Sequence, residues 1–235
     1  MNDAGHTRRA LSGDAQAAAR GRMVDEQLVA RGIRDPHVLA AMREVPRHLF
    51  LPPELEALAY ADRALPAEAG QTISQPWIVA RMLELASIAP GARVLEVGTG
   101  TGYQTALLAW LAGHVWSLER LEPLAAGAAA RLAALGVTNV RVRTGDGSLG
   151  WQEFAPYASV LAAAAAPHAP RALLDQLDEV GVLVAPVGGV RSQRLETWRR
   201  ERDGFRTERH GECRFVPLIG RDAWSGDPDP GPEQQ

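Results

Sequence analysis

The chain has 235 residues, of which 46% are hydrophobic and 23% charged, and its formal net charge is −3. This length and composition predict one soluble globular domain with a single large core. The negative charge gives no overall electrostatic reason to expect nucleic acid as a partner, and no apolar run reaches the roughly 20 residues that a membrane span needs.

The two ends of the chain are rich in glycine, proline and polar residues, so we expect residues 1–12 and 225–235 to be mobile. Residues 13–224 form one predicted domain, with a helical cap and substrate segment at 13–90 and a nucleotide-binding sheet and hairpin at 91–224. The N-terminus lacks the apolar core of a secretory signal, and the single cysteine allows no internal disulfide. Both observations favour a cytoplasmic location.

Helices interrupted by prolines are predicted for the first part of the domain. The first runs from Asp14, a possible N-cap, to Gly32, a typical helix stop. The next begins at Pro36 with Asp35 as its cap, because proline is favoured at the first helical position. A third helix is predicted to start near Pro76.

From residue 93 onward, short apolar strands alternate with helical stretches. Strands are predicted at 93–98, 114–119, 140–145, 159–164 and 181–188, and helices at 102–112, 121–136 and 170–178. This alternation predicts a mainly parallel sheet covered on both faces. In the arginine-rich segment that follows, acidic residues are interleaved and Asp203-Gly204 is typical of a hairpin turn. We interpret this segment as an antiparallel hairpin with a solvated face, whose second strand ends in CRFVPLIG.

A glycine-rich loop follows the first of these strands, in the sequence VLEVGTGTGYQT. Its glycines are Gly98, Gly100 and Gly102, and Tyr103 stands where the dinucleotide fingerprint G-x-G-x-x-G needs its third glycine. The chain contains no lysine, so the G-K-[S/T] of a phosphate-binding P-loop is absent as well. The loop therefore favours a nucleotide that has no phosphate to hold.

Carboxylates mark the ends of the next two strands. Glu119 can accept both hydrogen bonds of a ribose diol, and Asp146, between Gly145 and Gly147, can meet an adenine amino group. Ligands of open α/β sheets bind beyond the carboxyl ends of the strands, where strand order reverses. An adenosine with a charged amino-acid tail fits these positions, so we predict S-adenosylmethionine as the cofactor, with Glu96 near its positive end.

The stretch GQTISQPWIVARMLE, from Gly70 to Glu84, resembles a segment of the protein-L-isoaspartate O-methyltransferases. Further stretches match the family in order, namely DPHVLAAMREVPRHLF, RVLEVGTGTGYQTALLA, GDGSLGW, AAAPHAPRALLDQL and RFVPLIG. The resemblance implies a Rossmann-like methyltransferase fold. It also implies methyl transfer from S-adenosylmethionine to isoaspartyl residues of aged proteins and peptides, which is a protein-repair reaction.

Methyl transfer of this kind needs alignment of the acceptor rather than a general base. The free α-carboxyl of an isoaspartyl residue has a reference pKa near 3.5, so it is already ionised at neutral pH. The Ser74 hydroxyl can donate to one carboxylate oxygen while the other attacks, next to the N-terminus of the helix at Pro76. The alternative is that Ser74 only caps this helix.

The predicted site can now be given in full, with Ser74 as the catalytic residue. The predicted cofactor contacts are Thr72, Glu96, Gly98, Thr99, Gly100, Gly102, Tyr103, Glu119, Arg120, Gly145 and Asp146. The predicted substrate contacts are Ile73, Ser74, Trp77, Ala166 and Pro167. No metal site is predicted, because the histidines show no ligand spacing, and His168 is interpreted as a solvent-facing loop residue.

Two positions depart from the family pattern. Ala158 stands where an aspartate usually follows Tyr157, and Ala163 stands where threonine or glycine is common. These departures support one alternative, a relative that methylates an aspartate of a single dedicated peptide. A catalytically silent nucleotide-binding relative is a second alternative, against which the intact Ser74, Glu119 and Asp146 argue. A monomer is expected.

Overall fold

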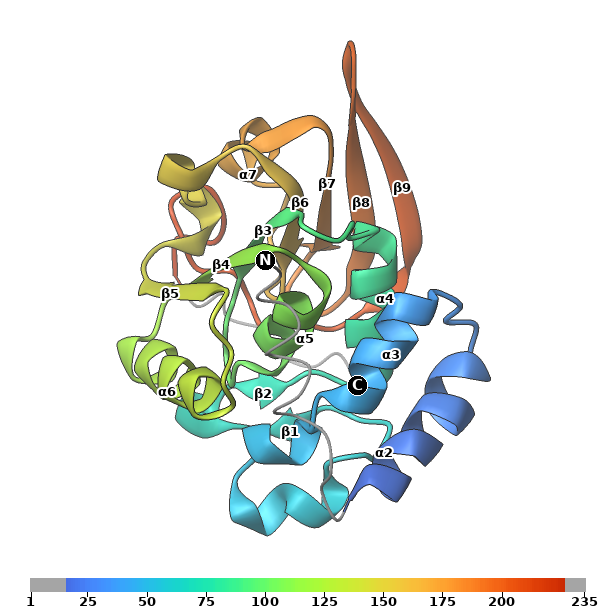
Figure 1. Cartoon of the computed structure of the whole chain (residues 1–235). Helices are drawn as coiled ribbons and strands as arrows, with labels where there is room; N and C mark the ends of the chain where they lie inside the picture. Colours follow the sequence, from blue (N-terminus) through green and yellow to red (C-terminus); the bar gives the residue numbers. More distant parts are fainter. Residues whose placement is uncertain (1–15, 227–235) are drawn as a thin grey trace, which may run out of the picture.

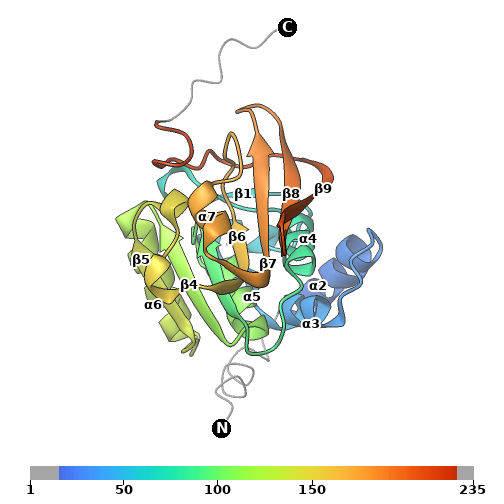
Figure 2. The same cartoon turned by 90° about the horizontal axis from the view of Figure 1, so that it is seen from above.

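The computed structural model describes residues 16–226 and shows a seven-stranded sheet (Figure 1). Its strands are β3 (Arg93–Val97), β4 (His114–Glu119), β5 (Val140–Thr144), β6 (Tyr157–Ala162), β7 (Leu177–Gly188), β8 (Gln193–Glu201) and β9 (Gly204–Cys213). They lie in the order β5-β4-β3-β6-β7-β8-β9, with β3 to β7 parallel and the β8–β9 hairpin antiparallel. Figure 2 shows β5 at one edge of the sheet and the hairpin at the other. The predicted fold class is confirmed.

The central strands β3, β4 and β6 are buried on both faces, with successive residues pointing to opposite sides of the sheet and into two different cores. Val94 pairs with Val115 in register, and both belong to the core formed with helices α4 (Pro76–Ala86) and α5 (Tyr103–Leu111). Leu95 pairs with Trp116, and both belong to the second core, which includes residues of α7 (Arg171–Asp175). Helix α6 (Glu122–Ala134) packs against β4 and β5. The strand order reverses at β3, which carries the glycine loop.

The first part of the domain is helical, as predicted. It contains α2 (Ala17–Arg22), the π-helical turns Met23–Val29 and α3 (Pro36–Glu44). The Asp35 carboxylate accepts from the backbone N–H groups of His37 (2.8 Å) and Val38 (3.2 Å), so its predicted capping role is confirmed. Gly32 has φ +96°, which explains the predicted stop. Asp14, the predicted cap of the first helix, lies outside the described residues.

Short elements complete the molecule. The strands β1 (Leu65–Pro66) and β2 (Thr72–Ile73) form a small antiparallel ribbon that leads into α4. Single turns of 3-10 helix lie at Arg47–Phe50, Pro53–Leu58, Glu68–Gly70, Gly147–Leu149 and Gln152–Phe154.

Several element boundaries differ from the sequence prediction, including β6, which spans Tyr157–Ala162 rather than 159–164. Helix α7 ends at Asp175, because β7 begins at Leu177 and continues the chain as an extended strand. The two-residue hairpin turn is Arg202-Asp203 rather than Asp203-Gly204, since Gly204 already pairs with Glu201 in the ladder. The last hairpin strand ends at Cys213, so RFVPLIG is not part of it.

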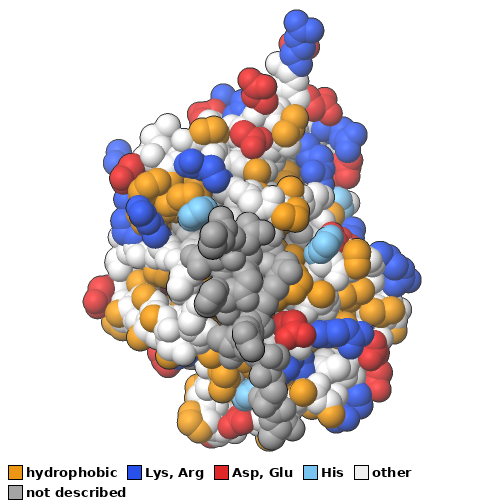
Figure 3. All heavy atoms as spheres, viewed as in Figure 1, with side chains coloured by type: hydrophobic (Ala, Val, Ile, Leu, Met, Phe, Trp, Pro, Cys, Tyr) orange, Lys and Arg blue, Asp and Glu red, His pale blue; other side chains and the backbone are white. Residues whose placement is uncertain are grey.

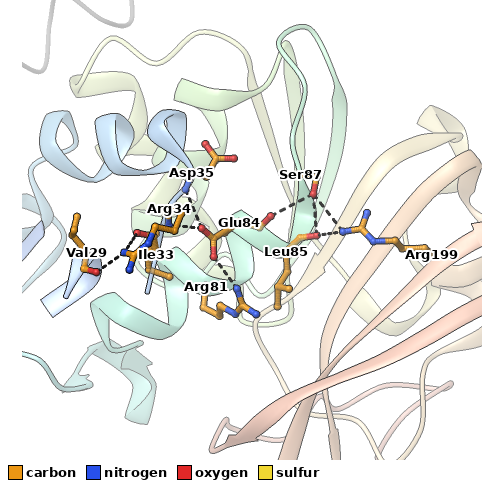
Figure 4. Close-up of polar contacts among 9 residues, drawn as sticks. All are labelled: Val29, Ile33, Arg34, Asp35, Arg81, Glu84, Leu85, Ser87 and Arg199. Carbon is orange, nitrogen blue, oxygen red and sulfur yellow. Dashed lines mark hydrogen bonds and ion pairs between the residues drawn. The ribbon is translucent and has the colours of Figure 1, made fainter. Parts of the chain in front are cut away.

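Helix α4 is joined to the helical cap through Glu84 (Figure 4). One carboxylate oxygen of Glu84 accepts from the backbone N–H groups of Arg34 (2.6 Å) and Asp35 (2.9 Å). The other oxygen is bound by the Arg81 guanidinium at 2.8 Å. Burial alone would raise the pKa of Glu84, but these donors outweigh it and lower the pKa below its ordinary value.

The same helix is joined to the sheet at its C-terminal end (Figure 4). Arg199 of β8 donates to the Leu85 carbonyl at 2.8 Å and to the Ser87 hydroxyl at 3.3 Å. Ser87 is the C-cap residue and has φ +50°. Because α4 is held on both sides, its N-terminus and the preceding Ser74 have a fixed position relative to the sheet.

Candidate active site

A cavity of about 330 Å³ lies beyond the ends of β3 and β4, next to β2. It is called the inner cavity below. Of the predicted site residues it is lined by Thr72, Ile73, Ser74, Gly98, Thr99, Gly100, Tyr103, Glu119 and Arg120. The structure thus brings together residues from the glycine loop, the second strand end and the segment before α4. These are segments that the sequence analysis assigned to one site.

The glycines of the loop are required by its backbone. Gly98, Gly100 and Gly102 have φ angles of +93°, +53° and +92°, which side chains with a Cβ rarely adopt. A Cβ on Gly102 would also lie 3.3 Å from the Cβ of Ala128 on α6. Gly102 is the N-cap of α5 and does not line the cavity, so its role is to let the loop turn into the helix.

Glu119 is held rigidly at the wall of the inner cavity. Its Oε2 accepts from the backbone N–H of Gly100 (2.9 Å), and its Oε1 accepts from that of Leu121 (3.0 Å). The side chain is buried, at 7% exposure, yet it lines the cavity. Each carboxylate oxygen keeps a lone pair beyond the one used in these bonds. The carboxylate is therefore already oriented to accept from a pair of ligand hydroxyls.

Glu96 lies behind the loop and does not line the cavity. Thr99 hydrogen-bonds to Ser117 (2.6 Å), and the hydroxyls of Ser117 and Thr105 each donate to Glu96 Oε2 at 2.6 Å. Complete burial raises the pKa of Glu96 to about 7, against the hydrogen bonds from Ser117 and Thr105 that favour the ionised form. The bonds in the structure make Glu96 a support for the loop, and its predicted contact with the cofactor stays a prediction.

Asp146 is also directed into the protein. Its Oδ1 accepts from the N–H and the hydroxyl of Ser148 (2.9 and 2.6 Å), and its Oδ2 accepts from the N–H of Arg221 (2.8 Å). Gly147 lines the inner cavity, but Gly145 and Asp146 do not. The adenine contact predicted for Asp146 stays a prediction. What the structure shows is a bond between the end of β5 and the C-terminal segment.

Ser74 lies where the inner cavity meets a second, larger depression of about 810 Å³, called the outer groove. The residues that line both are Thr72, Ser74, Ala163, Val216 and Pro217. Within residues 16–226 the Ser74 hydroxyl makes no hydrogen bond, and Gln75, not Ser74, is the N-cap of α4. The alternative of a purely capping serine is therefore not what the structure shows.

Trp77 lines the outer groove on its cap side. The Arg31 guanidinium lies 4.5 Å from the centre of the Trp77 ring and forms an ion pair with Asp62 at 2.6 Å. The Trp77 Nε1 is buried and has no hydrogen-bond partner among the described residues. These contacts place an aromatic surface beside Ser74, at the position predicted for substrate binding.

Ala166 and Pro167 line neither cavity. Ala166 is 1% exposed, and its backbone N–H donates to the Pro186 carbonyl at 3.2 Å. The loop residues that do reach the site are Ala163 and Ala164, three positions earlier. A run of identical residues carries no signal for which of its members face a ligand, and the substrate contacts predicted for Ala166 and Pro167 stay predictions. His168 is exposed, in agreement with its interpretation as a loop residue.

The C-terminal segment forms a wall of the inner cavity that the sequence analysis did not assign to the site. Val216 to Ile219 line it, and the Leu218 N–H donates to the Ala165 carbonyl at 2.7 Å. A Cβ on Gly220 would lie 2.1 Å from the Asp146 carboxylate, so this approach requires glycine. The family match of RFVPLIG was the one sequence signal for this wall. Within the described residues, no group of three or more potential ligands could hold a metal ion.

Comparison with known proteins gives one consistent family. The family described as "Protein-L-isoaspartate(D-aspartate) O-methyltransferase (PCMT)" matches residues 19–223. Protein-L-isoaspartate O-methyltransferase 1 of Rhodopseudomonas palustris (strain HaA2) is 53% identical over 219 residues, which are 92% of this chain and 89% of that protein.

Solved structures show the same fold. A protein-L-isoaspartate O-methyltransferase aligns with a TM-score of 0.77 at 29% identity, over 87% of this chain and 67% of that one. A putative enzyme of this kind from Plasmodium falciparum, solved in complex with S-adenosyl-L-homocysteine, aligns with a TM-score of 0.76 at 24% identity, over 86% of this chain and 99% of that one.

Proposed function

Because this chain belongs to the protein-L-isoaspartate O-methyltransferase family, we propose that its inner cavity holds the methyl donor and its outer groove holds the isoaspartyl acceptor. The enzyme is an S-adenosylmethionine-dependent carboxyl methyltransferase that acts on L-isoaspartyl residues of damaged proteins and peptides. The observation that carries the assignment of the two cavities is that Ser74 lines both of them.

The residues of the inner cavity fit an adenosine with an amino-acid tail. Glu119 presents a carboxylate fixed by two backbone N–H groups, which suits a ribose diol. Gly98 and Gly100 let the backbone approach a ligand closely, and Arg120 is the single basic side chain among the residues that line the cavity. When bound, S-adenosylmethionine supplies a methyl group whose bond to sulfur breaks as the bond to the carboxylate oxygen forms.

Ser74 is proposed to orient the acceptor. Its hydroxyl has no hydrogen bond within the described part of the chain, so it is available to donate to one oxygen of an α-carboxylate. The N-terminus of α4, two residues on at Pro76, adds a favourable potential for an anion. No base is needed, because the acceptor carboxyl is already ionised at neutral pH. Orientation of two reacting groups in this way can lower a barrier by several kcal/mol.

The methyl ester leads to repair by its own chemistry. The backbone amide nitrogen of the following residue attacks the ester carbonyl, methanol leaves, and a succinimide forms. Hydrolysis of the succinimide returns part of the product as normal aspartate. The enzyme therefore has to supply only the methylation step, for which the Ser74 hydroxyl is proposed to orient the acceptor.

The assay that tests this function compares one peptide in two forms, with an isoaspartyl or a normal aspartyl residue at the same position. Methyl incorporation is measured from labelled S-adenosylmethionine. We expect the isoaspartyl form alone to be methylated. Preference for the aspartyl form would identify an enzyme that modifies a dedicated peptide. Cofactor binding without any turnover would identify a silent relative.

The class of partner, the oligomeric state and the location of the enzyme are also proposed. Acidic and basic side chains are interspersed on the face of the molecule that Figure 3 shows, which supports a protein or peptide rather than nucleic acid as partner. A monomer and a cytoplasmic location agree with the single domain and the single cysteine. Among the described residues, no helix is long and apolar enough to cross a membrane.

A further inference from the structure

The outer groove differs in charge from the chain as a whole, whose net charge is −3. Four arginines and two acidic residues line it, namely Arg31, Arg63, Arg191, Arg214, Asp62 and Glu212. A groove with this excess of positive charge attracts anionic ligands and repels cationic ones, an effect that is strongest at low salt.

The two acidic side chains are already matched by neighbours. The Asp62 carboxylate is bound by Arg31 at 2.6 Å and by the Gln75 side-chain amide at 2.8 Å. Glu212 lies directly opposite Arg194 in the β8–β9 ladder, where side chains on one face are close neighbours. Asp62 thus neutralises Arg31, whereas Glu212 faces an arginine outside the groove lining, and the groove keeps an excess of positive charge.

Arg63 and Arg214 are the groove arginines whose charge is not paired with a carboxylate of the described chain. Both are exposed, and neither side chain forms a hydrogen bond or ion pair with another residue of the described chain. They reach the groove from distant segments, Arg63 from the helical cap and Arg214 from the residue after β9. A guanidinium presents several N–H groups in a plane and binds carboxylates in a bidentate manner.

We propose that Arg63 and Arg214 make the outer groove select isoaspartyl substrates that carry an acidic side chain close in sequence to the damaged residue. The inference rests on the function proposed above. Exposed ion pairs contribute little individually, so each arginine is expected to change KM by roughly two- to fivefold. The preference acts on binding of the flanking side chain and not on the methyl transfer at Ser74.

Three isoaspartyl peptides test the proposal. They differ only at the second position after the isoaspartyl residue, which is glutamate, glutamine or lysine. For the parent enzyme we expect KM to rise in the order glutamate, glutamine, lysine. The spread should be roughly fivefold or more in low salt and should shrink at high ionic strength. Equal KM values for the three peptides would overturn the proposal, while the proposed function would stand. Turnover of none of the three would overturn the proposed function itself.

The double variant Arg63→Gln with Arg214→Gln assigns the effect to these two residues. We expect the ratio of kcat/KM between the glutamate and lysine peptides to fall toward one. The matched control, Arg202→Gln with Arg206→Gln at the protruding end of the hairpin (Figure 1), should keep the parent ratio. A double variant that retains the parent ratio would overturn the assignment. If the double variant is inactive, the two single variants are measured instead. Each should lower the logarithm of the kcat/KM ratio between the glutamate and lysine peptides by about half of its parent value.

Discussion

The inner cavity and the outer groove adjoin at Ser74 but are built in different ways. The inner cavity depends on backbone conformation and on carboxylates held by N–H groups, such as Glu119 with Gly100. The outer groove depends on exposed side chains from segments far apart in sequence, such as Arg63 and Arg214. A binding site of the first kind is rigid before its ligand arrives, whereas one of the second kind adjusts to many peptides. The difference suits one invariant cofactor and many different damaged proteins.

The largest effect is expected from Glu119→Ala, which removes the fixed carboxylate of the inner cavity. Loss of two charge-assisted hydrogen bonds to the cofactor costs about 3 kcal/mol, or roughly a hundredfold in Kd. Titration calorimetry measures this affinity, with Glu122→Ala on the exposed start of α6 as the matched control. If cofactor affinity is unchanged, Glu119 does not bind the cofactor. The contrast between a preformed inner cavity and an adaptable outer groove would then lose its main support.

Ser74→Ala tests the residue that belongs to both cavities. The methyl-transfer rate is expected to fall roughly ten- to a hundredfold, because a hydrogen bond to a charged group contributes about 1.5–3 kcal/mol. Cofactor Kd should stay close to the parent value. Since neither a serine nor the acceptor carboxyl titrates there, the parent maximal rate should be nearly flat from about pH 6 to 8. A steep rise near pH 6.5 that disappears in His168→Ala would show a histidine base instead.

Glu96→Gln tests the buried support of the glycine loop through its pKa of about 7. In the unfolded chain the pKa of this group is near 4.3, so the folded protein holds its proton more tightly. The contribution of the more tightly held Glu96 proton to the free energy of unfolding is fully present below about pH 4.3 and is lost as the pH rises toward 7. The variant cannot ionise, so its Tm relative to the parent should rise between pH 5 and pH 8. The expected change is at least about 1.4 kcal/mol, the equivalent of one pKa unit.

The Glu96 measurement uses thermal melts of the protein without cofactor. Glu122→Gln, at an exposed position of α6, is the control and should show a constant difference from the parent. If the Tm difference for Glu96→Gln is the same at pH 5 and pH 8, the carboxyl is not the buried titrating group that the structure indicates.

The smallest effect is expected from Glu84→Gln, on the cap side of the site. The folded pKa of Glu84 is lowered, so its stabilisation is present above the unfolded pKa near 4.3 and is lost as the pH falls through the folded pKa. At pH 7 the variant should be less stable by about 1–2 kcal/mol, and the difference should shrink in acid below about pH 4.5. Urea unfolding measures this, with the exposed Glu54→Gln as control. If the difference in the free energy of unfolding between the parent and Glu84→Gln does not change with pH, the charge of the Glu84 carboxylate does not stabilise the fold.

Motif spacing predicted the inner cavity better than the outer groove, for a physical reason. Gly98, Gly100 and Glu119 are constrained by backbone geometry at strand ends, and the alternation of strands and helices predicts where those ends meet. No such rule relates Arg63 to Arg214, which meet only through the three-dimensional fold. The π-helical turns at Met23–Val29 were equally beyond prediction, since their sequence has an ordinary helical pattern.

The same reasoning explains why Asp146 and Ala166 do not line the inner cavity. Asp146 occupies the predicted strand end, but the position of its side chain depends on Arg221, 75 residues later. Ala166 belongs to a run of alanines whose burial is decided by the pairing with Pro186. In both cases a long-range contact determines the local orientation, and a single sequence does not contain that contact explicitly.

The contact between Asp146 and Arg221 also makes one wall of the inner cavity depend on a segment that is synthesised after the rest of the site. A nascent chain that has reached α7 already contains the glycine loop, Glu119 and Ser74, but not the wall from Val216 to Ile219. A product that terminates early, or that a protease cuts before residue 216, keeps most of the sheet and has an open cavity. The wall of the inner cavity is therefore complete only when this C-terminal segment has folded back onto the end of β5.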